Sequence, residues 1–395
     1  MPLGLGSNLS RAISKPITPG IVTDNLVLKH KYDAGSVVPI SDGSVYTNGV
    51  SDNINFGPLD MPSGAFTIGG WFWFASGQLE ERPTLIGRAT WAGTTKGFIL
   101  RFNTDSSASD TTALHVTMGD ATSSGNNQTD VYSTTIVRDQ WNHIMLTVDG
   151  EASGSKTLKC YLNGALDSTH TSVHYVPDDT STTDFLIHKA DNMNAADSEV
   201  KGYVCNCALW QTDLTQAQIK SIMNKKYAEL TDSEKTNLVS WWNLDTAYDS
   251  IVFDNHHNGG ETLGSELLTS WTNNDFTSFS SNGTDITSAV SDGSGNHEIY
   301  SNQIDITAGD TFKVTFTIGG NAGSGLDFRL SPHSHLGSAD YDTSALSAGT
   351  YEYYIKSGIT DSTSFFGFRS ANQTCDFSIS NFSVKKINGN TGKLT

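Results

Sequence analysis

The chain has 395 residues, enough for two or three domains of ordinary size. Only 17% of them are charged, against roughly 25% in an average globular domain, so Ser, Thr, Asn and Gly supply much of the polar surface, as in sheets joined by many turns. The formal net charge of −18 argues against a nucleic-acid partner, because an acidic surface repels phosphate groups.

Residues 1–45 are predicted to form an extended N-terminal arm. Four of the nine prolines lie within residues 1–40, and proline disfavours helix in itself and in the residue before it. Four basic residues against two acidic ones give residues 1–34 a charge of +2, which leaves −20 for the rest of the chain. A basic arm on an acidic body indicates that the two meet different partners. The predicted docking residues are Arg11, Lys15, Lys29 and Lys31.

The sequence gives no sign of a membrane or secretory segment. It has no apolar run of 18 residues and no signal-peptide core at its N-terminus. Its four cysteines form no disulfide framework and are read as free thiols. We therefore expect no membrane partner and assembly in a cytoplasm.

Residues 46–258 are predicted to form a first β-sandwich. Short apolar runs alternate with clusters of Gly, Asn, Asp and Ser, the pattern of many short strands. The runs cover residues 66–74, 84–88, 96–103, 113–119, 141–150, 157–164, 184–190 and 202–210. In the first of these, FTIGGWFWF, a bulge at Gly69-Gly70 is expected to shift the phase, and most of the run is assigned to the core. Capping boxes that begin at Thr215 and Thr231 predict one or two short helices near the end of this module.

Residues 259–395 are predicted to form a second β-sandwich. A polar, Gly-rich stretch at residues 246–264 marks the boundary. Alternating runs follow at residues 310–320, 325–331, 349–357, 364–370 and 375–387. The predicted fold class is therefore all-β, with two sandwich (jelly-roll) domains behind an extended arm.

The order of these motifs resembles that of known families. The opening YTNGVSDNINF, the run WNHIMLTVDG and the closing GYVCNCALWQTDLTQAQI are similar to a laminin-G/concanavalin A-like lectin domain. The segments ELLTSWTNNDF and FSISNFSVKKI resemble the ends of a carbohydrate-binding-module jelly roll of phage structural proteins. The arm, TPGIVTDNLVLKHKYDAGSVVPISDG, is similar to the start of virion proteins from phages of aquatic bacteria.

The resemblance implies glycan binding, which uses aromatic faces for stacking and amide or carboxylate groups for hydroxyls. Trp91 and Tyr341 are the predicted contacts, because both lie in turn-rich segments where a large aromatic has little packing role. Anchoring of a loop and a protein–protein interface remain alternatives.

Many domains of the resembled lectin family hold calcium, which takes six to eight oxygen ligands. Here Cys205 and Asn206 stand where acidic ligands are common, and Asp52 is the remaining candidate ligand. We therefore expect no cofactor and leave calcium at Asp52 as the alternative.

An enzyme of this fold would need two carboxylates on either side of a glycosidic bond. No E-x-D-x-x-E run delivers such a pair, and Glu80 and Glu81 are adjacent in a loop-like stretch. The chain is therefore predicted not to be an enzyme.

Together these patterns predict a non-enzymatic structural protein on the surface of a tailed-phage virion, either a capsid decoration or a head fibre. Its arm would bind capsid or other virion proteins, its sandwiches would display glycan-binding surfaces, and it would form a homo-oligomer. A tail-fibre or baseplate adhesin for host polysaccharide is the first alternative. A polysaccharide-degrading enzyme is the second.

Overall fold

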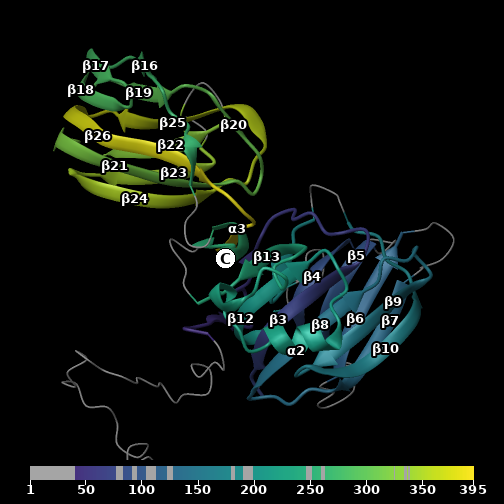
Figure 1. Ribbon diagram of the computed structural model, residues 1–395. Helices are drawn as coiled ribbons and strands as arrows, with labels where there is room; N and C mark the ends of the chain where they lie inside the picture. The colour runs from purple at the N-terminus through teal and green to yellow at the C-terminus, as the bar shows by residue number, and fades with distance from the viewer. Residues whose placement is uncertain are drawn as a thin grey trace, which may run out of the picture.

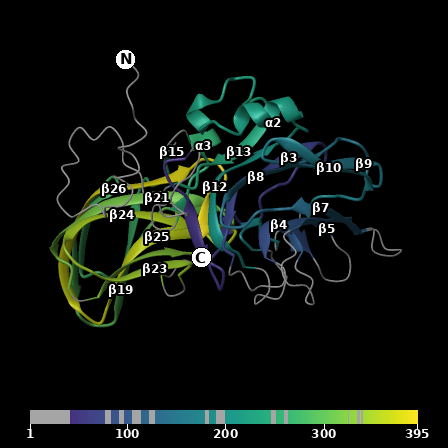
Figure 2. The ribbon, with the colours of Figure 1, turned by 90° about the horizontal axis from the view of Figure 1, so that it is seen from below.

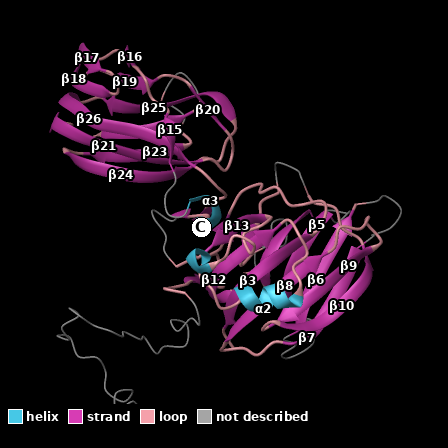
Figure 3. Ribbon diagram, viewed as in Figure 1, coloured by secondary structure: helices cyan, strands magenta, loops and turns pink. Residues whose placement is uncertain are grey.

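The structure is a computed structural model that describes most of the chain from residue 41 onward. The described ranges are 41–76, 83–90, 96–103, 113–121, 128–178, 183–189, 199–245, 251–258, 263–323, 325–332, 336 and 339–395. Residues 1–40 of the predicted docking arm lie outside them, and its last residue, Val45, begins the first strand of the structure. The described residues form antiparallel sheets with few helical turns (Figure 3), which confirms the all-β prediction.

The first sandwich consists of a seven-stranded sheet A and an eight-stranded sheet B. Sheet A has the order β1 (Val45–Asn48), β12 (Lys201–Trp210), β3 (Phe66–Phe74), β8 (Trp141–Val148), β9 (Lys156–Leu162) and β10 (Ala165–Val173), and β13 (Leu238–Trp242) also pairs with β12. Sheet B has the order β14 (Ile251–Val252), β27 (Gly392–Leu394), β2 (Ile54–Asn55), β11 (Leu186–Ile187), β4 (Thr84–Thr90), β5 (Lys96–Asn103), β6 (Ala113–Asp120) and β7 (Gln128–Thr135).

Strand β3 illustrates how the sequence specifies the two faces of sheet A. Successive side chains of a strand point to opposite faces, and the even-numbered positions from Phe66 to Phe74 supply the apolar core between the sheets. The odd-numbered Trp71 and Trp73 therefore lie on the outer face. The predicted bulge at Gly69-Gly70 is wrong, because the register of β3 with β8 runs unbroken through these residues. The bulge lies in the neighbouring strand β12, between Cys205 and Ala208.

Part of the outer face of sheet A is covered by the segment between β12 and β13. Helix α2 (Gln216–Ile222) begins with the predicted capping box, in which Thr215 and Gln218 bond reciprocally. A 3-10 turn η2 (Tyr227–Glu229) and a short helix α3 (Asn255–Asn258) follow. The predicted box at Thr231 forms its hydrogen bonds with Glu234 but encloses a turn, since β13 begins at Leu238. No described helix is long and apolar enough to cross a membrane.

The second sandwich consists of two six-stranded sheets. Sheet C has the order β17 (Ser278–Asn282), β18 (Asp285–Asp292), β26 (Thr374–Ile387), β21 (Thr311–Asn321) and β24 (Gly349–Lys356), and β15 (Leu263–Glu266) pairs with β26. Sheet D has the order β16 (Trp271–Asn274), β19 (Asn296–Ser301), β25 (Asp361–Ala371), β22 (Leu326–Ser331) and β23 (Tyr341–Leu346), and β20 (Ile304–Ile306) pairs with β25. A separate core rich in phenylalanine fills the space between them.

The end of the described chain returns to the first sandwich. Strand β27 lies between β14 and β2 of sheet B and pairs with both, although residues 259–395 were assigned to the second module from sequence. Figure 1 places the C-terminus beside α3 and β13, away from the strands of the second sandwich. The second sandwich is therefore inserted between two strands of the first, β14 and β27.

Buried polar contacts hold this junction. The Trp242 indole N–H donates to the carbonyl oxygen of Asn390 over 2.7 Å. The fully buried Asp254 carboxylate accepts hydrogen bonds from the backbone N–H groups of Trp241, His256 and Asn390. These contacts join β13 and α3 to the segment that leads into β27.

Candidate functional site: an aromatic row on sheet A

Four aromatic residues occupy paired positions on four neighbouring strands, on the outer face of sheet A. The register pairs Tyr46 of β1 with Tyr203 of β12, Tyr203 with Trp73 of β3, and Trp73 with Trp141 of β8. Residues paired across adjacent strands lie side by side on one face. The row is therefore perpendicular to four neighbouring strands, and we refer to these residues as the aromatic row.

The rings contact one another but do not lie in one plane. The centroids of Tyr46 and Tyr203 are 4.9 Å apart with an interplanar angle of 49°. Trp73 meets Tyr203 edge-on at 5.4 Å and 78°, and Trp141 lies 6.5 Å from Tyr203. Such tilted contacts are favourable between aromatic rings, so the row is held in place by its own members.

The row is partly open to solvent. Tyr46 is 47% exposed, and the other three members are half-buried. Two further large apolar residues are exposed near the row: Val50, which follows β1, and Val137, which precedes β8. An exposed apolar surface of this kind marks a binding site more often than a scattered single residue does.

The two tryptophans of the row differ from the other described tryptophans in the hydrogen bonding of their indole N–H groups. Each of the other described tryptophans donates to an oxygen atom of the chain: Trp71, Trp210, Trp241, Trp242 and Trp271. The Nε1 atoms of Trp73 and Trp141 are covered and have no acceptor among the described residues. A buried donor without a partner costs about 1–3 kcal/mol and requires an explanation.

One side of the row is bounded by the cover of α2. Trp71, in the next outward position of β3, is buried and donates its N–H to the carbonyl oxygen of Met223 just after α2. Figure 2 shows α2 on the outer side of β3 and β8, with β4 and β5 in the opposite layer. The aromatic row therefore lies beside a wall of protein rather than on an open plane.

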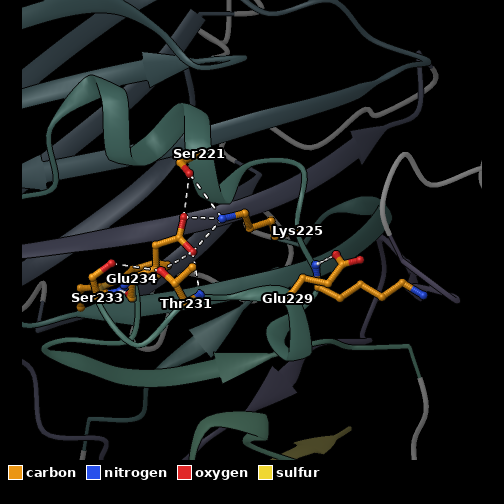
Figure 4. A network of polar contacts seen from close by, with 8 residues as sticks. Ser221, Lys225, Glu229, Thr231, Ser233 and Glu234 are labelled. Carbon is orange, nitrogen blue, oxygen red and sulfur yellow. Dashed lines mark hydrogen bonds and ion pairs between the residues drawn. The ribbon is translucent and has the colours of Figure 1, made fainter.

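A charged network fixes this wall. The Glu234 carboxylate accepts from the Lys225 ammonium at 2.6 Å and from the Ser221 hydroxyl at 2.7 Å, and it also bonds to Thr231 (Figure 4). Partial burial opposes ionisation, but the bonds from Lys225, Ser221 and Thr231 lower the pKa of Glu234 to about 2. The carboxylate is thus ionised at neutral pH and ties α2 to the turn before β13.

None of the residues predicted from sequence belongs to the aromatic row. Trp91 and the four arm cations, Arg11, Lys15, Lys29 and Lys31, fall outside the described residues. Tyr341 is half-buried on β23 of the second sandwich, where its ring meets Tyr353 edge-on at 6.1 Å. Trp91 and Tyr341 as glycan contacts, and the cations as docking residues, stay predictions.

Asp52 has a structural role in the turn after β1. Its carboxylate accepts from the backbone N–H of Asn48 at 3.1 Å and from the Ser51 hydroxyl at 3.4 Å. Among the described residues, no group of three or more His, Cys, Asp or Glu side chains is arranged to hold a metal ion. Calcium at Asp52 stays an untested alternative.

One cluster contains the three residue types of a hydrolase triad in an unsuitable order. Asp120 accepts from the Ser153 hydroxyl at 2.5 Å and contacts the His174 imidazole at 3.0 Å. In a triad the imidazole lies between the nucleophile and the carboxylate, so that it can remove the hydroxyl proton. Here the carboxylate lies in the middle, and this geometry does not activate Ser153.

The aromatic row was not predicted from the sequence. Trp91 and Tyr341 were favoured because they lie in turn-rich segments, and most of FTIGGWFWF was assigned to the core. The signal that was present is strict alternation, which puts Trp71 and Trp73 on the face opposite Phe72 and Phe74. Alternation alone could not place Tyr46, Tyr203 and Trp141 beside Trp73, because pairing between distant strands is not encoded locally.

Comparison with known proteins finds a family match within the first sandwich. Residues 48–220 match the Laminin_G_3 family, described as the concanavalin A-like lectin/glucanases superfamily. The matched segment runs from the end of β1 into α2, so the first sandwich is similar to the lectin-like domains of that family. Three of the four residues of the aromatic row, Trp73, Trp141 and Tyr203, lie within the matched segment. No curated protein matches the chain.

Solved structures resemble parts of the chain at low sequence identity. A candidate carbohydrate binding protein from Bacteroides ovatus ATCC 8483 has 16% identity and a TM-score of 0.39 over 53% of this chain, and the chain covers only 54% of that protein. The SAP-like pentraxin of Limulus polyphemus has 14% identity and a TM-score of 0.30, over 45% of this chain and 83% of its own. The CBM40 module of the Ruminococcus gnavus IT-sialidase has 13% identity and a TM-score of 0.34, over 46% of this chain and 99% of the module.

Proposed function

We propose that this protein is a non-enzymatic glycan-binding protein and that the aromatic row is its binding site. The observation that carries the proposal is the cross-strand register of Tyr46, Tyr203, Trp73 and Trp141 on a partly open sheet face. Sugar rings stack their C–H faces on aromatic rings, so a row of rings on a partly open face offers several stacking positions to one glycan. The lectin family matched by residues 48–220 supports this assignment.

The test is a glycan array probed with the full chain and with a Tyr46→Ala/Tyr203→Ala double variant. Loss of two stacking rings is expected to weaken binding about fivefold to hundredfold, at about 0.5–1.5 kcal/mol for each ring. The matched control is Tyr300→Ala, which removes a half-buried tyrosine from sheet D of the second sandwich. Equal affinity of the double variant and the wild type for every bound glycan would refute the row as the site.

The place of action that we propose is the surface of a tailed-phage virion, as a capsid decoration or head fibre. Support comes from the charge of +2 on residues 1–34 against −20 on the rest, and from the resemblance of the arm to virion proteins. In this proposal Arg11, Lys15, Lys29 and Lys31 meet the particle while the sandwiches face outward, and the chain assembles in the host cytoplasm as a homo-oligomer.

Cross-linking from the arm lysines in intact particles tests this location. Products with the major capsid protein are expected. Products with tail or baseplate proteins would instead favour the receptor-binding adhesin. Cross-links to neither class would remove the virion assignment and leave glycan binding to be judged by the array alone.

A further inference from the structure

The length of the aromatic row limits the ligand that it takes. Tyr46 and Trp141 stand at its ends, separated by three steps between adjacent strands. The ring centroids of Tyr46 and Tyr203 are 4.9 Å apart and those of Tyr203 and Trp141 are 6.5 Å apart, which matches roughly two glycosidic steps and therefore about three successive pyranose rings. A ligand that uses the whole row is therefore an oligosaccharide or an internal segment of a polysaccharide, not a monosaccharide.

The ring planes limit its shape. Tyr203 is inclined by 49° to Tyr46 and by 78° to Trp73, so no flat object contacts all three faces at once. The ordered face of a crystalline polymer is flat and would rest on one ring. A single chain can rotate about each glycosidic bond and turn successive sugars to meet successive rings.

The charges around the row limit its chemistry. Among the described residues, Lys201 lies two positions before Tyr203 on β12, Arg138 and Asp139 precede β8, and Asp52 follows β1, so these four charges sum to zero. Carboxylate and sulfate ligands are recognised by clustered guanidinium or ammonium groups. Beyond the row, residues 35–395 carry −20, the total of −18 less the arm's +2, and this field repels a polyanion.

The two unpaired indoles supply a polar complement. The N–H groups of Trp73 and Trp141 have no acceptor among the described residues and are covered by neighbouring atoms. Hydroxyl and ring oxygens of a neutral sugar accept hydrogen bonds from indole N–H groups, so a ligand whose binding uncovers either N–H would remove an energetic penalty that the free protein carries.

We infer that the aromatic row binds a single, uncharged polysaccharide chain through about three successive pyranose rings, in preference to acidic glycans and to crystalline polymer surfaces. This inference rests on the glycan-binding function proposed above. It adds the class of the ligand, and its test separates the two.

The experiment measures the binding of the full chain by calorimetry to three kinds of carbohydrate. Soluble neutral gluco-, xylo-, manno- and chito-oligosaccharides are used as length series from the disaccharide upward. Alginate and polygalacturonate oligosaccharides of matched length serve as acidic ligands, and microcrystalline cellulose serves as the insoluble one. We expect affinity for a neutral series to rise about tenfold or more up to the trisaccharide and then to level off, with acidic and crystalline ligands at least tenfold weaker.

Variants identify the contribution of the indole groups. Trp141→Phe keeps a stacking face and removes the N–H, and a loss of several-fold in affinity for the neutral ligand is expected. Trp271→Phe is the matched control, since its indole bonds to Thr284 in the second sandwich. Two results would overturn this inference: tighter binding of acidic or crystalline ligands, or an affinity for neutral oligosaccharides that does not depend on their length. If the Tyr46→Ala/Tyr203→Ala variant loses that binding, the proposed glycan-binding function still stands. Absence of any row-dependent binding would overturn both.

Discussion

The two sandwiches share an architecture and differ in what they place on their outer faces. Sheet A carries aromatic rings in register across four strands. Sheet D carries charges instead: Arg369 of β25 lies between Glu298 and Asp327, its register partners on the neighbouring strands. Arg329 pairs with Asp327 at 3.1 Å and with Asp342 at 3.0 Å. The charged residues of sheet D form ion pairs with one another, whereas the aromatic row leaves apolar surface in contact with water.

This difference indicates that the sandwich architecture shared by the two modules does not by itself determine which of them binds a ligand. Alternating positions of both modules supply a closed apolar core. The other positions decide whether a face binds or is inert, and they are free to vary because they do not affect core packing. We expect the first sandwich to recognise the ligand and the second to act as a rigid partner attached through β27.

The largest expected effect comes from Trp242, at the point where the modules meet. Its side chain is fully buried, its ring lies 4.6 Å from Phe56, and its N–H holds Asn390. Trp242→Ala should cost about 3–5 kcal/mol, because it leaves a cavity and removes the anchor of the segment before β27. Calorimetric unfolding should show loss of stability, and hydrogen exchange of Gly392–Leu394 should accelerate.

Trp271→Ala is the control for the loss of a buried tryptophan that lies away from the junction. Trp271 is also buried and also bonds through its indole, to Thr284, but it lies within the second core. A similar loss of stability is expected, with protection of β27 retained. If Trp242→Ala leaves exchange of β27 unchanged, the indole does not anchor the strand.

The next effect in size concerns pH at the same junction. Lys356 of β24 donates to the carbonyl oxygens of Asn55 and Thr391. Burial lowers the pKa of its ammonium to about 7, with Asp184 opposing the shift and Lys393 adding to it. Between about pH 7 and 10.5 the unfolded chain holds this proton more tightly than the folded protein, so stability rises with pH across that window.

The measurement compares the melting temperatures of the wild type and Lys356→Met from pH 7 to pH 10. Wild type should gain stability relative to the variant as pH increases, because the cost of burying the charge disappears. Lys313→Met serves as the control, since Lys313 pairs with Glu352 at 3.1 Å on the same sheet. A constant difference between wild type and Lys356→Met would show that Lys356 does not titrate in this range.

Sequence patterns predicted the local features and missed those that depend on pairing. Alternation and turn residues predicted both sandwiches, and the capping box at Thr215 predicted α2. The return of β27 to sheet B was not predicted, because a three-residue strand has no distinctive pattern. The aromatic row was missed for a related reason: Tyr46 and Tyr203 are far apart in sequence, and only the register of β1 with β12 unites them.

The smallest expected effect is that of Tyr341, and it tests the comparison most directly. Tyr341 and Tyr46 are tyrosines on sheet strands, but Tyr341 packs against the second core while Tyr46 is exposed. Tyr341→Ala should therefore lower stability by about 1 kcal/mol and change glycan affinity by less than about twofold. Tyr46→Ala should do the reverse, with stability nearly unchanged and affinity reduced about tenfold. Chemical denaturation and calorimetric titration of the two variants measure both quantities. If Tyr341→Ala weakens glycan binding as much as Tyr46→Ala does, the second sandwich contributes its own binding surface, and the division between a binding module and a supporting module is wrong.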